Sequence, residues 1–409
     1  MRAALQTVLV LVTFASSAVT QAAAIAGDDA VTRLESRLSS GDATIEGETR
    51  AAKLRALLDA LEIEVASQTL VFSKTSFQND RISPDNPRAI YFGDDVHIGF
   101  VPGSDLVELA AIDSGKGVQF YTLEFAEHGA PRITRRSEEC FTCHSTSRTR
   151  SVPGLIVRSV EVDASGRLRT DRKTYHTTAK SPLENRWGGW AVTGSPVRLD
   201  HMGNRVLHGE GVVPVDSVAL VRGHLARTSD VVALMVLEHQ CQALNAITRA
   251  GIACRTALDR QAAANRACDD PPEFVSPATL RAIHAAADEV VAALLFKDEA
   301  RLAVPIDAES AFAKRFTARG KRDLRGRSLR DFDLRQRLFR YPCSYLIDSP
   351  ALRALPRLAR ERILDRMQRV LTGRLSMRRW GIPRSVRSEI LEIVDETRGG
   401  LAKVLDLDS

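Results

Sequence analysis

The N-terminal half of the chain carries short apolar runs separated by turn residues. Five runs of apolar or aromatic residues occupy 68–74, 88–95, 96–101, 106–113 and 118–125. Gly, Pro, Asp and Asn cluster between these runs, and such residues favour tight turns. The pattern predicts a β-meander, in which consecutive strands pair antiparallel.

Two later stretches extend this β-rich part. Residues 154–171 predict a hairpin that turns at 163–166, where Asp and Gly stand between two apolar runs. Residues 186–194 are aromatic and rich in Gly, and we expect them to be extended as well.

The apolar spacing becomes helical near residue 229. Ser229 or Asp230 is a suitable N-cap for a first long helix, and Ser276 with Pro277 opens a second one. A shorter helix is predicted upstream of the strands. The predicted helices occupy 46–62, 229–250, 276–296, 355–373 and 383–397.

These patterns together predict an α+β fold. The N-terminal half is β-rich and carries a cysteine-containing loop near residue 140, and the C-terminal half is mainly helical. The expected organisation is a leader at 1–26, an N-terminal helical segment at 27–64, a β-rich region at 65–228 and a helical, Arg-rich region at 229–409.

The first 26 residues have the layout of a secretory signal peptide. Arg2 precedes an apolar run of 12 residues that ends at Val19, too short to span a bilayer as a helix. Small residues then offer cleavage sites near Ala24 or Ala26. We therefore expect an exported protein, periplasmic or secreted, without a membrane span in the mature chain.

The charge is uneven along the chain. The whole sequence has a net charge of +6, but residues 314–387 alone contain 22 Lys or Arg against 6 Asp or Glu. A solvated, Arg-rich surface explains this excess, and a docking face for an acidic protein partner is the functional alternative. Nucleic acid is not an expected partner of an exported protein.

The six cysteines are expected to be used in an oxidising compartment. Cys140 and Cys143 form one close pair. The other four allow three pairings, of which Cys254 with Cys268 closes a short predicted loop and leaves Cys241 with Cys343.

The pentad Cys140-Phe-Thr-Cys143-His144 is the most specific motif of the sequence. C-x-x-C-H is the attachment motif of c-type haem. Each thiol adds across a vinyl group of the haem, and the adjacent histidine supplies an axial nitrogen to the iron. Covalent attachment of this kind takes place outside the cytoplasmic membrane, where the predicted signal peptide directs the chain.

Three other uses of the cysteine pair are less favoured by the sequence. A thioredoxin-like redox pair stands at the start of a helix, and the residues after His144 predict no long helix. A zinc site needs a second ligand pair at finger spacing, which the sequence lacks. A structural disulfide between neighbours so close in sequence closes a small ring and removes little chain entropy.

The sequence resembles a group of secreted bacterial proteins that carry a cytochrome c-type haem signature and have no established function. The strongest similarity is in CFTCHSTSRT, and RISPDNPRAIYFGDDVHIGF, RWGGWAVTG, HMGN and ALMVLEHQ are similar to further segments of these proteins. The resemblance implies one covalently bound haem c and electron transfer, and it implies no substrate.

The expected fold differs from that of a small all-α class I cytochrome c, because residues 151–200 predict strands and loops. We expect a mono-haem c-type cytochrome that exchanges single electrons with redox partner proteins. Two alternatives stay open. One is a haem-dependent oxidoreductase or peroxidase with an open distal site, and the other is a haem-based redox or gas sensor module.

The sixth iron ligand has four candidates in the sequence. His201 and Met202 are adjacent in a predicted loop, His239 lies in an apolar helix, and His176 lies in another loop. Each of these residue types can ligate haem iron, and the choice sets the redox potential. Core packing or surface exposure is the ordinary role of a lone histidine or methionine.

Further side chains are candidates for the surroundings of the haem. Trp187 and Trp190 could line it, although core packing in an aromatic strand is the favoured explanation for both. Arginine pairs well with carboxylates, so some of the arginines near the motif could bind the haem propionates. The candidates are Arg148, Arg150, Arg158 and Arg186.

Overall fold

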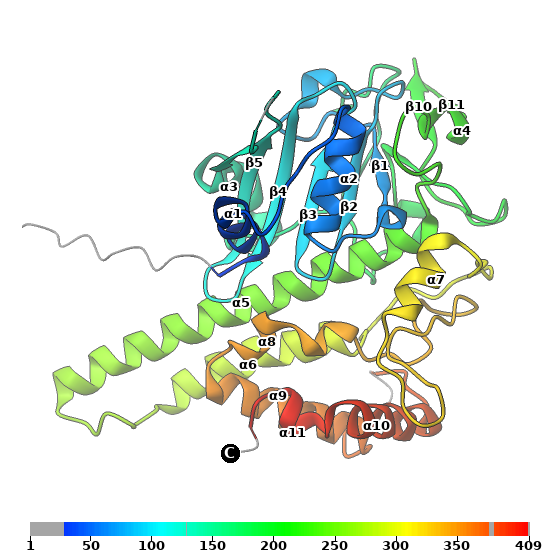
Figure 1. The fold of residues 1–409 in the computed structure, drawn as a ribbon. Coiled ribbons are helices and arrows are strands. Elements are labelled where there is room, and N and C mark those ends of the chain that lie inside the picture. Colours follow the sequence, from blue (N-terminus) through cyan, green and yellow to red (C-terminus); the bar gives the residue numbers. More distant parts are fainter. Residues whose placement is uncertain (1–27, 128, 376–379, 408–409) are drawn as a thin grey trace, which may run out of the picture.

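The computed structural model describes residues 28–409 except 128, 376–379 and 408–409. The predicted signal peptide therefore lies outside the described residues. The fold is mixed, with an antiparallel sheet in the N-terminal half and helices in the C-terminal half, as the sequence predicted (Figure 1). No helix in the described part of the chain is long and apolar enough to cross a membrane.

The predicted meander is the centre of a seven-stranded sheet. Its order is β6-β5-β4-β3-β2-β1-β9, and neighbouring strands pair antiparallel. The strands are β1 (Thr69–Val71), β2 (Arg88–Phe92), β3 (Val96–Phe100), β4 (Leu106–Asp113), β5 (Gly117–Glu124), β6 (Arg132–Arg135) and β9 (Trp190–Ala191).

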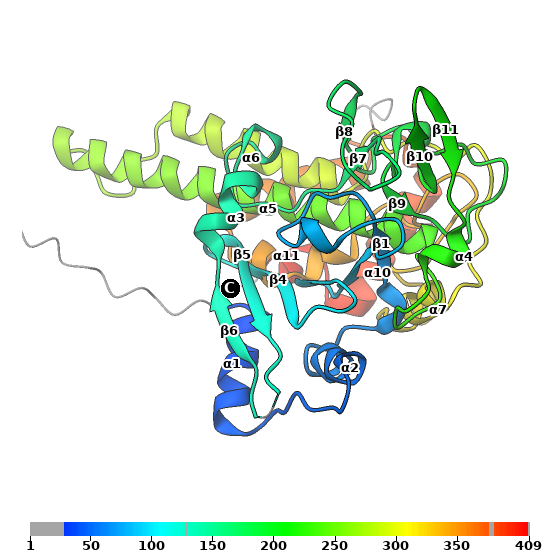
Figure 2. The ribbon, with the colours of Figure 1, turned by 90° about the horizontal axis from the view of Figure 1, so that it is seen from above.

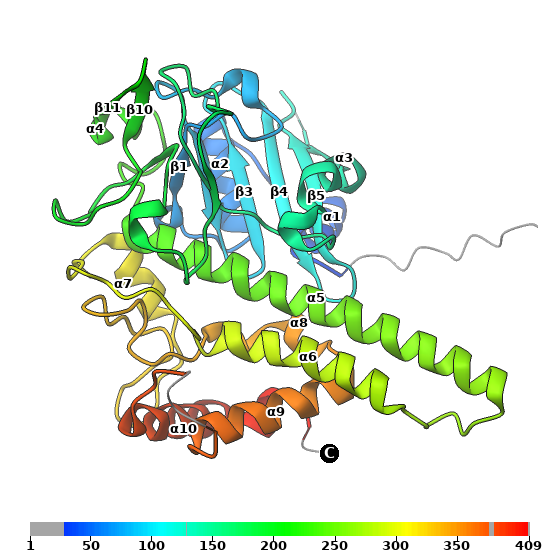
Figure 3. The same ribbon diagram turned by 180° about the vertical axis from the view of Figure 1, so that it is seen from behind.

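Both faces of the sheet are covered. Helices α1 (Ala30–Ser40) and α2 (Arg50–Ala60) pack on one face, where Ile98, Leu109 and their neighbours form one hydrophobic core. The 38-residue helix α5 (Val231–Cys268) crosses the other face (Figures 2 and 3). A second, larger core lies on that side and contains residues from both halves of the chain.

The remaining helices pack against α5 and against one another at the bottom of Figure 1. They are α6 (Pro277–Leu294), α7 (Ala311–Ala318), α8 (Pro350–Arg353), α9 (Arg357–Leu371), α10 (Arg384–Arg398) and α11 (Leu401–Val404). Two small sheets, β7 (Arg158–Val160) with β8 (Thr174–His176) and β10 (Arg205–His208) with β11 (Gly211–Pro214), and helix α4 (Ser217–Leu220) complete the β-rich half.

Local signals place these elements correctly. The side chain of Asp230 accepts hydrogen bonds from the amides of Val232 and Ala233 and caps α5, as predicted. Ser276 caps α6, with Pro277 at its first turn. The predicted hairpin turn is also present, with Gly166 at φ +84°.

Two predictions about the cysteines are wrong. The motif of Cys140 and Cys143 lies in the short helix α3 (Ser137–His144), not in a loop. Cys254 and Cys268 lie in the same helix, 14 residues apart, so about 21 Å of helix separates them, whereas a disulfide needs Cα atoms within about 7 Å. Cys241 and Cys343 are both buried and unbonded.

Many arginines of the basic segment pair with carboxylates of other elements. Arg362 binds Asp288 of α6 at 2.9 Å, and Arg327 binds Glu392 of α10 at 2.7 Å. Their charge therefore serves contacts within the fold. The docking of an acidic partner on this segment stays a prediction.

A buried ion pair joins α5 to the loop before β9. Glu238 of α5 accepts a hydrogen bond from Arg186 at 2.7 Å, and the two side chains are 0% and 2% exposed. Burial raises the pKa of Glu238, and the arginine opposes that shift. Removing one partner leaves the other charge buried without compensation.

We predict that Glu238→Ala lowers the free energy of unfolding by about 3–5 kcal/mol. The matched control is Glu289→Ala, since Glu289 pairs with Arg150 at 2.6 Å but is 41% exposed. The control should cost less than about 1 kcal/mol. Urea unfolding followed by circular dichroism measures both, and equal losses would show that Glu238 is not held as a buried pair.

Candidate functional site

The three residues of the C-x-x-C-H motif line one cavity. Its volume is about 480 Å³, within the range of small-molecule and cofactor sites. Cys140, Cys143 and His144 of α3 form one wall, the sheet face of β2 to β5 forms another, and Leu237 and Cys241 of α5 contribute to a third. The structure thus brings together the three residues that the sequence predicted.

Helix α3 is fixed to the sheet at Phe120 of β5. The carbonyl of Phe120 accepts from the amide of Arg136 at 2.8 Å, and its amide donates to the hydroxyl of Ser137 at 3.1 Å. The Phe120 ring then lies 4.7 Å from the ring of His144, between centroids. One residue therefore holds both the start of the helix and the histidine at its end.

The hydrogen bond of His144 fixes its tautomer. Nδ1 lies 2.9 Å from the carbonyl oxygen of Gly154. Since a carbonyl only accepts, Nδ1 carries the proton and Nε2 keeps its lone pair. Burial lowers the pKa of His144, which favours the neutral imidazole. A neutral ring whose other nitrogen donates to a backbone carbonyl is the usual state of a metal-bound histidine.

Helix α5 holds the loop that carries this carbonyl. The side chain of Asn245 accepts from the amide of Leu155 at 2.8 Å and donates to the carbonyl of the same residue at 2.6 Å. Gly154 fits because a Cβ at this position would lie 2.8 Å from Asn245 Oδ1. The loop is therefore pinned one residue away from the bond to His144.

The two thiols differ in their surroundings. Cys143 is exposed, whereas Cys140 is partly buried. Burial, followed by the nearby carboxylates of Glu108 and Glu139, raises the pKa of Cys140 to about 11. A redox-active pair uses a cysteine whose pKa is lowered. No long helix follows His144, as the sequence predicted, because α3 ends there and only a short turn at Ser147–Thr149 comes next. The raised pKa of Cys140 is a second argument against a redox pair.

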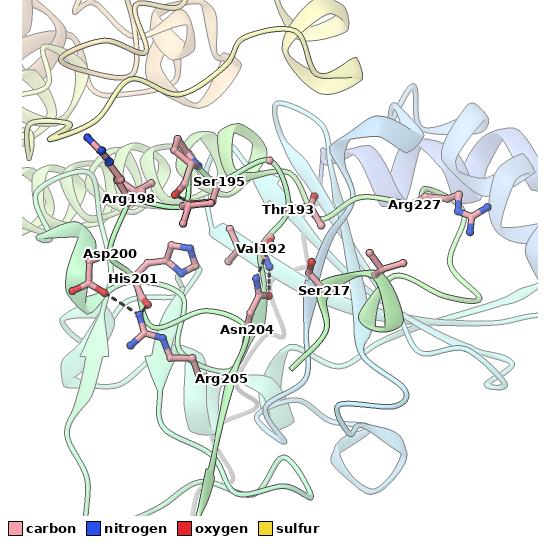
Figure 4. Close-up of a pocket in the computed structure, with 15 residues that line it drawn as sticks. Val192, Thr193, Ser195, Arg198, Asp200, His201, Asn204, Arg205, Ser217 and Arg227 are labelled. Carbon is pink, nitrogen blue, oxygen red and sulfur yellow. Dashed lines mark hydrogen bonds and ion pairs between the residues drawn. The ribbon is translucent and has the colours of Figure 1, made fainter. Parts of the chain in front are cut away.

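His201 and Met202 do not line this cavity. His201 lines a separate hollow of about 620 Å³, together with Asp200 and Arg205, which pair at 2.9 Å (Figure 4). Its Nδ1 accepts from the amide of Gly203 at 3.0 Å. The sulfur of Met202 accepts from the hydroxyl of Ser159 at 3.5 Å.

His239 and His176 also lie outside the lining of the cysteine cavity. His239 is fully buried, bonded through Nε2 to Ser344 Oγ at 2.7 Å and stacked on Phe296. The helical rotation of about 100° per residue explains its position, because Leu237 faces the cavity and His239 is two residues further on. His176 is exposed on β8.

The tryptophans and arginines expected around the haem include some that line the cavity and some that do not. Trp190, Arg148 and Arg158 line the cavity. Trp187 is buried outside its lining, next to His201. Arg150 and Arg186 are held by Glu289 and Glu238.

Sequence reasoning missed the sheet residues of the site. Arg88, His97 and Glu108 line the cavity, and Arg88 pairs with Glu108 at 2.6 Å. The sequence signal that could have found His97 is the alternation of β3. Val96, Ile98 and Phe100 face one core, and the residues between them face the other side of the sheet.

We predict that Asn245→Ala loosens the loop and hydrates the ring of His144. The pKa of His144 should then rise toward its ordinary value of about 6.5, because burial is the main cause that lowers it. An NMR titration of the histidine ring protons in the chain expressed without cofactor measures this shift.

The matched control is Gln242→Ala, one turn earlier on α5, where Gln242 binds the amide of Ala179 at 3.1 Å. It should destabilise the fold without changing the titration of His144. An unchanged titration in Asn245→Ala would refute the role of this side chain.

Comparisons with protein-family models, with curated proteins and with solved structures found no match to this chain.

Proposed function

We propose that this chain is an exported mono-haem c-type cytochrome that transfers single electrons. Cys140 and Cys143 hold the haem covalently, and His144 supplies one axial nitrogen to its iron. The observation that carries the proposal is the placement of all three side chains on one cavity, with Nε2 of His144 left free by the bond from Nδ1 to Gly154.

The state of the thiols fits attachment to vinyl groups. Each sulfur bonds to one vinyl carbon and the thiol hydrogen goes to the other, so no oxidant is consumed. The raised pKa of Cys140 keeps its proton in place near neutral pH. The exposure of Cys143 leaves the open side of the cavity accessible to the machinery that attaches the cofactor.

The charge of the cavity fits a ligand with carboxylates. Arg88 and Arg136 of the lining pair with Glu108 and Glu139. The lining also contains Lys74, Arg148 and Arg158, for which the described residues supply no carboxylate partner. Guanidinium groups bind carboxylates strongly, and the haem propionates are two such groups.

The protein ligands fit a metal that brings ligands of its own. In the described part of the chain no group of three or more His, Cys, Asp or Glu side chains is arranged to hold a metal ion. A zinc ion in a structural site needs four protein ligands. Haem iron takes four nitrogens from the porphyrin and needs only axial ligands from the chain.

Bound haem would supply the one-electron change between ferric and ferrous iron. The chain holds its ligand histidine neutral and oriented, and the apolar side chains of Phe120, Trp190 and Leu237 limit the access of water. Burial and neighbouring charge are the means by which a protein sets the potential.

The test is expression with residues 1–26 in a host that matures haem c. The purified protein should give the α-band of a c-type pyridine haemochrome, and the colour should resist extraction with acidic acetone. Cys140→Ala with Cys143→Ala should abolish both. Cys268→Ala is the matched control, because this exposed cysteine lies at the far end of α5. A colourless wild-type protein after correct export would refute the proposal.

One observation favours a second candidate, a haem-dependent oxidoreductase or peroxidase with an open distal site. None of His176, His201, Met202 and His239 lines the cavity. High-spin ferric iron in the purified protein would support this candidate, and low-spin iron would support electron transfer.

The unpaired arginines give a further prediction. Arg158→Ala should lower the midpoint potential by tens of millivolts, because loss of a nearby positive charge stabilises ferric over ferrous iron. Arg148→Ala should act in the same direction. Arg150→Ala is the control and should leave the potential unchanged, because Arg150 is exposed and paired with Glu289.

Spectroelectrochemical titration measures all three variants. Equal shifts in Arg158→Ala and Arg150→Ala would contradict the placement of the propionates near Arg158.

A further inference from the structure

His97 of β3 is a buried histidine on the wall of the cysteine cavity. It is 7% exposed, and it lines the same cavity as His144. The two imidazoles reach the cavity from different elements, one from the sheet and the other from the end of α3. His97 is not among the candidate iron ligands named from the sequence.

The register of the sheet places His97 relative to the motif. His97 pairs with Ala110 of β4, and Ala110 pairs with Phe120 of β5. Strands lie about 4.8 Å apart, so His97 and Phe120 are about 10 Å apart across the sheet. Phe120 contacts the ring of His144, which puts the two histidines at the same level of the sheet.

The ring of His97 has unused hydrogen-bonding capacity. In the described part of the chain neither Nδ1 nor Nε2 has a hydrogen-bond partner at accepted geometry. Burial lowers its pKa to about 4, and a weak hydrogen bond with the backbone of Ala110, too poor in geometry to satisfy either nitrogen, acts in the opposite direction. Buried polar side chains nearly always have a partner, so an unpaired neutral imidazole on a cavity wall points to a ligand.

Small residues lie beside His97 on its own strand and on the neighbouring strand. Ala110 beside it is small, and Gly99 two residues on has no side chain, so Arg88 crosses over it to reach Glu108. On the other side Phe92 stacks on His97 with 6.3 Å between ring centroids. The ring is thus supported by Phe92 on one side, and it belongs to the cavity lining with both of its nitrogens buried.

We propose that His97 supplies the second axial nitrogen to the haem held by Cys140, Cys143 and His144. The inference rests on the proposed function. Among the histidines and methionines of the described chain, His97 and His144 line this cavity. The iron would be six-coordinate and low-spin, which suits electron transfer. No open distal site would then remain for the oxidoreductase or peroxidase activity of the second candidate function.

The experiment compares spin states in the haem-loaded, full-length protein. Wild-type ferric protein should be low-spin by electron paramagnetic resonance and by its visible spectrum. His97→Ala should lose the low-spin signal and gain a high-spin one while keeping the same haem content per chain. Added imidazole should restore the low-spin signal, because it replaces the missing ring.

His97→Met provides a second variant if His97→Ala fails to fold. It should stay low-spin, gain the red charge-transfer band of methionine-ligated ferric haem and have a higher midpoint potential than the wild type. His201→Ala and Met202→Leu are the controls and should keep the wild-type spectrum.

The outcomes separate this inference from the proposed function. Absence of a c-type α-band in the wild type overturns both. A normal α-band with high-spin wild-type iron overturns the role of His97 alone. So does a low-spin His97→Ala variant, or a His97→Met variant with unchanged potential and no new band.

Discussion

The arrangement of the protein depends on three polar side chains of helix α5, of which Glu238 and Gln240 are fully buried and Asn245 is partly buried. Glu238, Gln240 and Asn245 bind Arg186, the carbonyl of Asp94 and the backbone of Leu155. Each bond fastens a different loop of the β-rich half to the helix. Because these groups are desolvated, leaving one unpaired is costly, so the loops have little freedom to move away.

The geometry of the candidate site depends on helix α5 and on strand β5. Asn245 fixes the loop, the loop presents the carbonyl of Gly154, and that carbonyl sets the tautomer of His144. Phe120 sets the position of α3 on the sheet. The motif supplies the reactive groups, and the surrounding fold decides that the lone pair of Nε2 and both thiols meet at one cavity.

Much of this could be predicted from the sequence, because the signals are local. Alternation predicted the meander, and Asp230 and Ser276 predicted helix starts. The spacing of Cys140 and Cys143 pointed to a site, and the two cysteines line one cavity. The proposed second ligand could not be predicted, since His97 is 47 residues away from His144 and looks like any residue of a buried strand. Its role depends on the register of β3 to β5, which is a tertiary property.

The candidate distal ligands that the sequence offered do not line the cavity of His144. His201 and Met202 lie in a predicted loop, where they bond to Gly203 and Ser159. His239 does not line the cavity, because it and Leu237 lie on different faces of the helix. The residues between Cys254 and Cys268 were expected to form a short loop, yet they are rich in Ala, Arg and Gln, which favour a helix.

The most direct test of the account is the intact mass of the mature protein under denaturing conditions, after maturation in a host that attaches haem c. The account predicts a polypeptide that carries one covalently bound haem. A bare polypeptide mass, with free thiols at Cys140 and Cys143 or a disulfide between them, would contradict it.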